Sequence, residues 1–190
     1  MVEFIEEGHI YKLDGQVIPS VTQILDAAGL GGFKNNYTEQ TAERGTNIHK
    51  TVELFCQAKL TRENLTPAAI PYINAWVKFC KDYNFTSQRQ ETRDASPNLK
   101  VGFTIDHFGF LATPDNTAIV DIKTGVQKIA DVIQICAYGL MNPAKRLLIL
   151  YLSSERYKVV EVKGYDRQRG ERTFLSALSL YQFRKKEKLL

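Results

Sequence analysis

Apolar and polar residues alternate over "HIYKLDGQVI", residues 9 to 18, which predicts a short strand hairpin with Asp14-Gly15 at its turn. A helix is predicted directly after it. Pro19 leads into this helix, Ser20 caps it, and Gln23 completes a capping box three residues later. The segment "GLGGFKNNY" then ends the helical pattern.

Two longer helices follow, over about 39–59 and about 67–83. In the first, Ile48, Val52 and Phe55 recur at helical spacing and form an apolar stripe. We expect the hairpin and these helices to form an N-terminal layer over residues 1–83.

The remaining residues, 84–190, show strand patterns interrupted by one helix and closed by another. The predicted elements are strands at 85–92, 101–110 and 117–123, a helix over about 127–141, strands at 147–152 and 157–162, and an amphipathic helix from about 166. This order predicts an α/β fold with a central mixed sheet flanked by helices. No repeat or low-complexity linker divides the chain, so we expect one domain over 1–190.

Composition supports an ordinary globular protein, with 44% hydrophobic and 24% charged residues. The net charge of +4 is unevenly placed. Residues 1–43 hold seven acidic and two basic residues, whereas residues 151–190 hold ten basic and five acidic residues. A polyanionic partner near the C-terminal part fits this distribution.

Apolar runs such as "LLILYL" are too short to cross a bilayer, and the N-terminal residues lack a signal-peptide pattern. We therefore expect a cytoplasmic protein without a membrane partner. The three cysteines, Cys56, Cys80 and Cys136, are widely spaced in helix-like segments, which indicates reduced core thiols.

The stretch "AIVDIKTG", residues 118 to 125, places two charges at the end of an apolar strand. Asp121 and Lys123 point to one face because alternate strand residues share a face. A hairpin turn centred on Pro114-Asp115 would pair Asp106 with Lys123 and bring Asp106 to the same face. A slip of one residue would move Asp106 to the other face.

Two carboxylates held this close favour a bound cation, and hard oxygen ligands suit Mg²⁺ or Mn²⁺. A cation there could polarise a phosphoryl oxygen, and Lys123 could offset charge in the transition state. This chemistry is phosphodiester hydrolysis. A lone D-x-K motif is usually only a surface ion pair, so further polar residues are needed to support a site.

Two helices supply such residues at a spacing of four. "RGTNIHKTVE" places His49 and Glu53 on one helix face beside the apolar stripe. "QICAYG" places Gln134 and Tyr138 one turn apart on the helix after the D-x-K strand, where they could hold a phosphate or a metal-bound water.

The ordered motifs "RGTNIH…E", "GFTID", "VDIKTG" and "QICAYG" resemble the PD-(D/E)XK nuclease superfamily, in particular its RecB-like branch, which includes lambda-type phage exonucleases. "IPSVTQIL" and "QICAYGLMN" look closer still to the mitochondrial genome maintenance exonuclease and its phage relatives. The resemblance covers roughly residues 9 to 163. It implies a restriction-endonuclease-like core.

The resemblance also implies roles for individual residues. Asp106 and Asp121 correspond to metal ligands, joined by the Ile122 carbonyl and by His49, and Lys123 corresponds to the catalytic lysine. Gln134 and Tyr138 match a motif that supports the site, and Glu53 matches an acid on the first helix. Glu91 has no clear counterpart in the motifs. Ile105 replaces the usual proline, and three scattered cysteines cannot supply an iron-sulfur cluster.

The resulting hypothesis is a DNA exonuclease that depends on Mg²⁺ or Mn²⁺ and acts in recombination, repair or genome maintenance in a bacterial cell or a phage-infected host. Its substrate would be single-stranded DNA or duplex with an end, contacted by Arg44, Lys50 and Lys128. Recombination or single-strand-binding proteins are candidate partners. An endonuclease on the same fold and a catalytically silent DNA-binding module are the alternatives.

Several other residues favour structural roles. His107 follows Asp106 and should point to the opposite strand face. His9 has no partner that the sequence identifies. Four aromatic residues could stack on unpaired bases or pack in the core, namely Tyr11, Phe33, Tyr37 and Trp76.

Overall fold

The computed structural model describes residues 1–31 and 39–190, with the backbone only at 39–42. Phe33 and Tyr37 lie outside the described residues. Within the described residues, no helix has both the length and the apolar character of a membrane span.

A small antiparallel sheet begins the chain, with β1 (Val2–Ile5), β2 (Ile10–Leu13) and β3 (Gln16–Ile18) in that order. The predicted hairpin is β2–β3. Asp14 and Gly15 have φ of 50° and 78°, as a tight turn between twisted strands requires. The strand β1, which pairs with β2, was not predicted.

The helical layer follows this sheet. Helix α1 (Val21–Ala27) starts at the predicted capping box, in which Ser20 and Gln23 bond to each other's backbone amides. Helices α2 (Glu39–Cys56) and α3 (Ile70–Tyr83) match the two longer predicted helices, and a short 3-10 turn, Arg62–Asn64, lies between them.

The central sheet has five strands in sequence order. They are β4 (Phe85–Ser96), β5 (Val101–Leu111), β6 (Thr117–Lys123), β7 (Arg146–Ser153) and β8 (Arg156–Glu161). The β6–β7 pair is parallel and the other pairs are antiparallel. Helix α4 (Ile129–Met141) makes the crossover between the parallel strands. The predicted α/β class, a mixed sheet flanked by helices with an N-terminal hairpin and helical layer, is confirmed.

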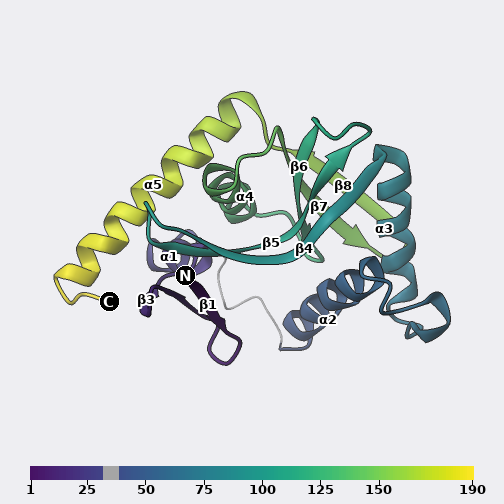
Figure 1. The fold of residues 1–190 in the computed structure, drawn as a ribbon, viewed down its shortest axis with the longest axis horizontal. Helices are drawn as coiled ribbons and strands as arrows, with labels where there is room; N and C mark the ends of the chain where they lie inside the picture. The colour runs from purple at the N-terminus through teal and green to yellow at the C-terminus, as the bar shows by residue number, and fades with distance from the viewer. Residues whose placement is uncertain (32–38) are drawn as a thin grey trace.

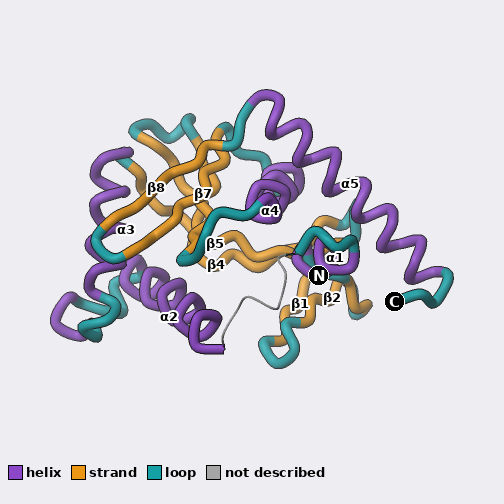
Figure 2. Tube along the Cα trace, turned by 180° about the vertical axis from the view of Figure 1, so that it is seen from behind, coloured by secondary structure: helices purple, strands orange, loops and turns teal. Residues whose placement is uncertain are grey.

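Helices cover both faces of the sheet (Figure 1). Helices α1, α4 and α5 (Gly164–Lys186) pack on one face around a core that includes Ile119 and Ile149. Helices α2 and α3 pack on the other face around Trp76 and Val120. Seen from behind, the two helical layers lie on opposite sides of the strands (Figure 2). The long strands β4 and β5 extend toward the N-terminal sheet (Figure 1).

The β5–β6 register differs from the predicted one by two residues. His107 pairs with Val120 and Phe108 with Ile119, so paired numbers sum to 227 rather than 229. The tight turn Thr113–Asn116 is centred on Pro114-Asp115, as predicted, but Leu111 bonds to Asn116 across the loop, so the midpoint of the strand pairing lies one residue earlier than predicted. A shift of two residues preserves the face of every side chain, so Asp106 still shares a face with Asp121.

Candidate metal-binding and catalytic site

A cavity of about 790 Å³ lies between the N-terminal sheet, α1 and α2 on one side and the central sheet with α4 on the other. Its lining includes most of the predicted site residues. These are His49, Glu53, Asp106, Asp121, Lys123, Gln134 and Tyr138, together with Lys50. Residues from four separate segments of the sequence therefore meet in one place.

Asp106 lies where β5 and β6 separate. The ladder between these strands ends at the pair His107 and Val120. Beyond it, the Asp106 carboxylate accepts a hydrogen bond of 2.7 Å from the Ile122 amide, which replaces a backbone partner. The same oxygen lies 3.3 Å from His49 Nδ1. Asp106 thus connects the end of β6 to helix α2.

Asp121 and Lys123 form a close pair on the face that packs against α4. The Lys123 ammonium lies 2.7 Å from Asp121 Oδ2, and the Asp121 residue is only 2% exposed. This buried oxygen accepts no hydrogen bond from any described residue, so the contact is an ion pair without hydrogen-bond geometry. A buried carboxylate oxygen with free acceptor capacity suits a further cation.

Helix α4 orients the lysine. Lys123 donates a hydrogen bond of 3.1 Å to Gln134 Oε1, and Gln134 Nε2 donates one of 2.6 Å to the Tyr138 hydroxyl. Gln134 and Tyr138 are thus neighbours on one helix face, as predicted. Their hydrogen-bonding groups are directed to Lys123 and to each other.

Helix α2 brings His49 and Glu53 to the cavity. Ile48 and Val52 are buried against the sheet, which leaves the adjacent face of the helix toward the site. Glu53 accepts hydrogen bonds from Lys50, at 2.7 Å, and from Gln57, at 3.1 Å. Glu53 also lines the cavity, but among the described residues its hydrogen bonds are to Lys50 and Gln57 and not to either aspartate.

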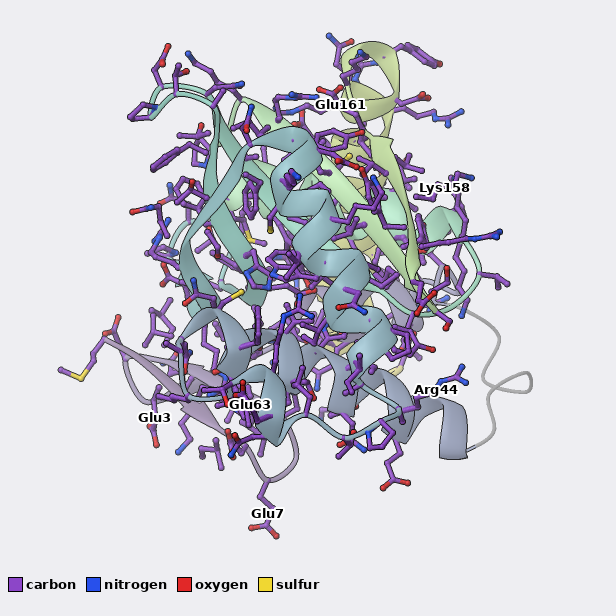
Figure 3. All side chains as sticks on the ribbon, turned by 90° about the vertical axis from the view of Figure 1, so that its right-hand side faces the viewer. Glu3, Glu7, Arg44, Glu63, Lys158 and Glu161 are labelled. Atoms are coloured by element: carbon purple, nitrogen blue, oxygen red, sulfur yellow. The ribbon has the colours of Figure 1, made fainter. Side chains whose placement is uncertain are left out.

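The three candidate DNA contacts lie at different places. Lys50 lines the cavity and pairs with Glu53. Arg44 is exposed near the start of α2 and points away from the body (Figure 3). Lys128 is half-buried at the N-cap of α4, where its backbone amide donates to Asp131 at 3.0 Å.

Glu91 is the residue that the sequence motifs missed. It lies on β4 between the pairs Gln90–His107 and Thr92–Ile105, directly across from Asp106. Potential ligand atoms of His49, Glu91 and Asp106 all lie within 4.8 Å of one another. The pairing of the strand at 85–92 with the strand of Asp106 could have indicated Glu91, but its register was not predictable.

The surroundings of Asp106 and Asp121 shift their pKa values in opposite directions. Burial raises the pKa of Asp106, but His49, Lys123 and the Ile122 amide outweigh it and lower the pKa to about 2. Burial raises the pKa of Asp121 to about 6, and the Asp106 charge adds to this effect against the opposing effect of Lys123. Burial and the Asp106 charge also raise the pKa of Glu91 to about 7.

Burial and the neighbouring carboxylates have opposing effects on the pKa values of His49 and Lys123. Burial lowers the pKa of His49, but the Asp106 charge outweighs burial and raises it above the ordinary value. Burial likewise lowers the pKa of Lys123, and the charges of Asp121 and Asp106 outweigh it. The neighbouring carboxylates therefore favour the protonated form of both groups, and a cation that binds His49 has to displace its proton.

The donor set fits a divalent cation. The buried carboxylate of Asp121 and the half-buried carboxylates of Asp106 and Glu91 offer oxygen ligands of the type that Mg²⁺ and Mn²⁺ accept, and the His49 imidazole offers a nitrogen. Asp121 Oδ2, which is buried and accepts no hydrogen bond from the described residues, supports this fit, although it forms an ion pair with Lys123.

Other predicted residues have structural contacts. His107 is buried, its Nδ1 lies 2.9 Å from Ser87 Oγ, and its ring packs on Trp76 at 4.4 Å. Tyr11 and Trp76 are buried in the core. Exposed His9 lines the cavity and contacts the Phe4 ring edge-on. The thiols of Cys56, Cys80 and Cys136 are free.

No protein-family model and no curated protein matches the chain. Among solved structures, the alkaline exonuclease LHK-Exo in complex with dAMP has a TM-score of 0.49 and 12% identity, over 91% of this chain and 95% of that one. A second structure of this exonuclease, from Laribacter hongkongensis, gives 0.49 and 12% over 90% and 94%. The structure of SSO0001 gives 0.36 and 14% over 84% of each chain. These weak likenesses carry no functional argument, so function is argued from the site.

Proposed function

We propose that the protein is a metal-dependent deoxyribonuclease that acts as an exonuclease at DNA ends. One observation carries this proposal. Asp106, Asp121 and Lys123 lie in one cavity with His49, and each is in contact with another member of the group. Such a set of carboxylates, imidazole and lysine suits hydrolysis of a phosphodiester.

In this proposal Asp106, Asp121 and His49 hold Mg²⁺ or Mn²⁺. The Ile122 amide points to Asp106, and a strand residue directs its carbonyl to the same side, so the Ile122 carbonyl is a further ligand. When bound, the cation supplies a Lewis acid that polarises the phosphoryl oxygen and lowers the pKa of a coordinated water.

Lys123 places its ammonium where negative charge develops on the phosphate. Gln134 restricts the position of this ammonium, and Tyr138 restricts Gln134 in turn. Glu53 holds Lys50 at the cavity, where the lysine can contact a phosphate. Arg44 and Lys128 are proposed contacts for the flanking strand, and residues 1–190 act as one nuclease domain.

The proposal is tested by incubating end-labelled single-stranded and duplex DNA with the protein in Mg²⁺ or Mn²⁺ and following product lengths over time. We expect mononucleotides or short products from the ends. The Asp121→Ala variant is the control for contaminating nucleases. Equal degradation by wild type and this variant would contradict the proposal and support a catalytically silent DNA-binding module.

A covalently closed circular single strand separates the two enzymatic alternatives. An exonuclease leaves the circle intact and degrades the same sequence once it is linearised. Cleavage of the circle at a comparable rate would instead support an endonuclease on the same fold.

A further inference from the structure

We propose that Glu91 is a direct ligand of the divalent cation held by His49 and Asp106. This inference rests on the proposed function, because it adds a ligand to the same site. It differs from the motif-based ligand set, in which Glu91 has no place. The cation would therefore be held from three elements, with His49 on α2, Glu91 on β4 and Asp106 on β5.

Distance and chemistry both support binding of one cation by His49, Glu91 and Asp106. One ligand atom from each of the three residues lies within 4.8 Å of the other two. Ligands around a small divalent ion lie about 3 Å from one another when each is about 2.1 Å from the metal. The three ligand atoms therefore have to approach one another by less than about 2 Å to bind a common cation. Asp121 does not belong to this group within the described residues.

The Glu91 carboxylate is not neutralised by a close ion pair. Among the side chains that the structure describes it makes no hydrogen bond or ion pair, and His49 and Arg93 act on it only through their charges. Asp121 differs, because Lys123 lies 2.7 Å from it. A cation between Glu91 and Asp106 would remove their mutual repulsion.

The backbone directs Glu91 into this arrangement. Its φ of 44° lies in the left-handed region, which is rare for a glutamate within a strand. Paired residues on both sides, Gln90 with His107 and Thr92 with Ile105, hold the strand in place around it. Such a conformation persists only where neighbouring structure imposes it.

Asp121 offers a further oxygen to a cation in the same cavity, beside its ion pair with Lys123. Asp121 Oδ2 is buried, accepts no hydrogen bond from the described residues and belongs to a residue of the cavity lining. This oxygen could complete the coordination from the β6 side. Glu91 would then be the ligand that closes the site on the β4 side.

Binding of Mn²⁺ to the full chain, measured by the electron paramagnetic resonance signal of free Mn²⁺ without DNA, tests the inference. We expect Glu91→Gln to raise the Kd for Mn²⁺ at least 10-fold, since even groups that only orient ligands contribute about 10- to 100-fold. The matched control is Glu7→Gln, an exposed glutamate that points off the β1–β2 turn (Figure 3) and should leave the Kd unchanged.

Glu91→Cys separates direct ligation from a structural role. A thiolate favours Zn²⁺ over Mn²⁺, so a ligand at this position should weaken Mn²⁺ binding and strengthen Zn²⁺ binding in the same variant. Equal losses for both metals would contradict ligation. Thermal unfolding of each variant without metal shows whether the fold is retained.

Asp106→Asn distinguishes failure of this inference from failure of the proposed function. If Asp106→Asn loses Mn²⁺ binding and cleavage but Glu91→Gln binds Mn²⁺ like wild type, Glu91 is not a ligand and the nuclease proposal stands. If wild type binds no Mn²⁺ and Asp106→Asn degrades DNA equally, both proposals are wrong.

Discussion

Lys123 donates a hydrogen bond of 3.1 Å to the side-chain oxygen of Gln134, eleven residues later in the chain. The lysine ends strand β6 and the glutamine lies in the following helix, α4. One strand–helix unit therefore contains both the proposed catalytic ammonium and the group that fixes its position.

Replacing Lys123 with alanine should reduce kcat by at least about 100- to 1000-fold, because a preorganised positive charge is lost from the transition state. The Kd for DNA should change little, since phosphate contacts elsewhere contribute most of the affinity. Single-turnover cleavage and fluorescence anisotropy measure the two quantities. Comparable losses in both would contradict the assigned role.

Tyr138→Phe removes the acceptor of the Gln134 amide and loosens the support of Lys123. We expect kcat to fall about 10-fold with little change in KM, as for other groups that position a reactive residue. In a Lys123→Ala background the same substitution should have no further effect on the rate. Tyr165→Phe, on an exposed part of α5, is the matched control.

His49→Ala should move the Mn²⁺ requirement of cleavage to higher concentration, because His49 contributes a proposed ligand next to Asp106. Activity measured across a Mn²⁺ titration gives the midpoint. Glu43→Ala, exposed on the same helix, should titrate like wild type. An unchanged midpoint for His49→Ala would leave the residue with a structural role only.

Arg44→Ala should reduce the salt dependence of single-stranded DNA binding. Loss of one phosphate contact lowers the slope of log K against log salt by about 0.7 for a single strand. Lys145→Ala is the control, because the Lys145 backbone amide donates to Thr117 Oγ1, which places this lysine at the end of β6 opposite the site. Identical slopes for Arg44→Ala and wild type would exclude Arg44 from the DNA contact.

Stability should depend on pH through His107. Burial lowers its pKa to about 4 from an ordinary value of 6.5. Between these values the unfolded chain binds a proton that the folded chain does not, so the free energy of unfolding falls as the pH falls. This group alone should cost about 2 kcal/mol between pH 7 and pH 5.

Urea denaturation at pH 7 and pH 5 measures this effect. His107→Asn should show a smaller loss of stability over the same interval, because the titrating group is gone. The comparison uses the difference between variant and wild type, since Glu91 contributes with the opposite sign. Equal pH dependence in the two proteins would show that His107 does not titrate as stated.

Much of the fold was predictable because local signals were strong. The β6 strand, 117–123, was predicted with its observed bounds, and the capping box at Ser20 fixed the start of α1. Side-chain alternation also placed Asp106, Asp121 and Lys123 on one face despite the two-residue register error. The turn itself was predicted at Pro114-Asp115, but the pairing register depends on loop geometry that the "ATPDN" segment does not specify.

Glu91 could not be predicted for a different physical reason. Its proximity to Asp106 comes from pairing between β4 and β5, including a register irregularity between Ser87 and Arg89, and from a left-handed residue. Neither feature has a local signature in "SQRQET". Contacts of this kind between strands require the three-dimensional structure.

The hydrogen bond from the Ile122 amide to the Asp106 carboxylate gives Asp106 two tasks. Truncation of this side chain would remove both the link between the ends of β5 and β6 and a negative charge, so an alanine variant would confound misfolding with lost chemistry. Asparagine is isosteric and retains an oxygen acceptor. The asparagine variant therefore removes the negative charge of Asp106 while it keeps an acceptor for the Ile122 amide.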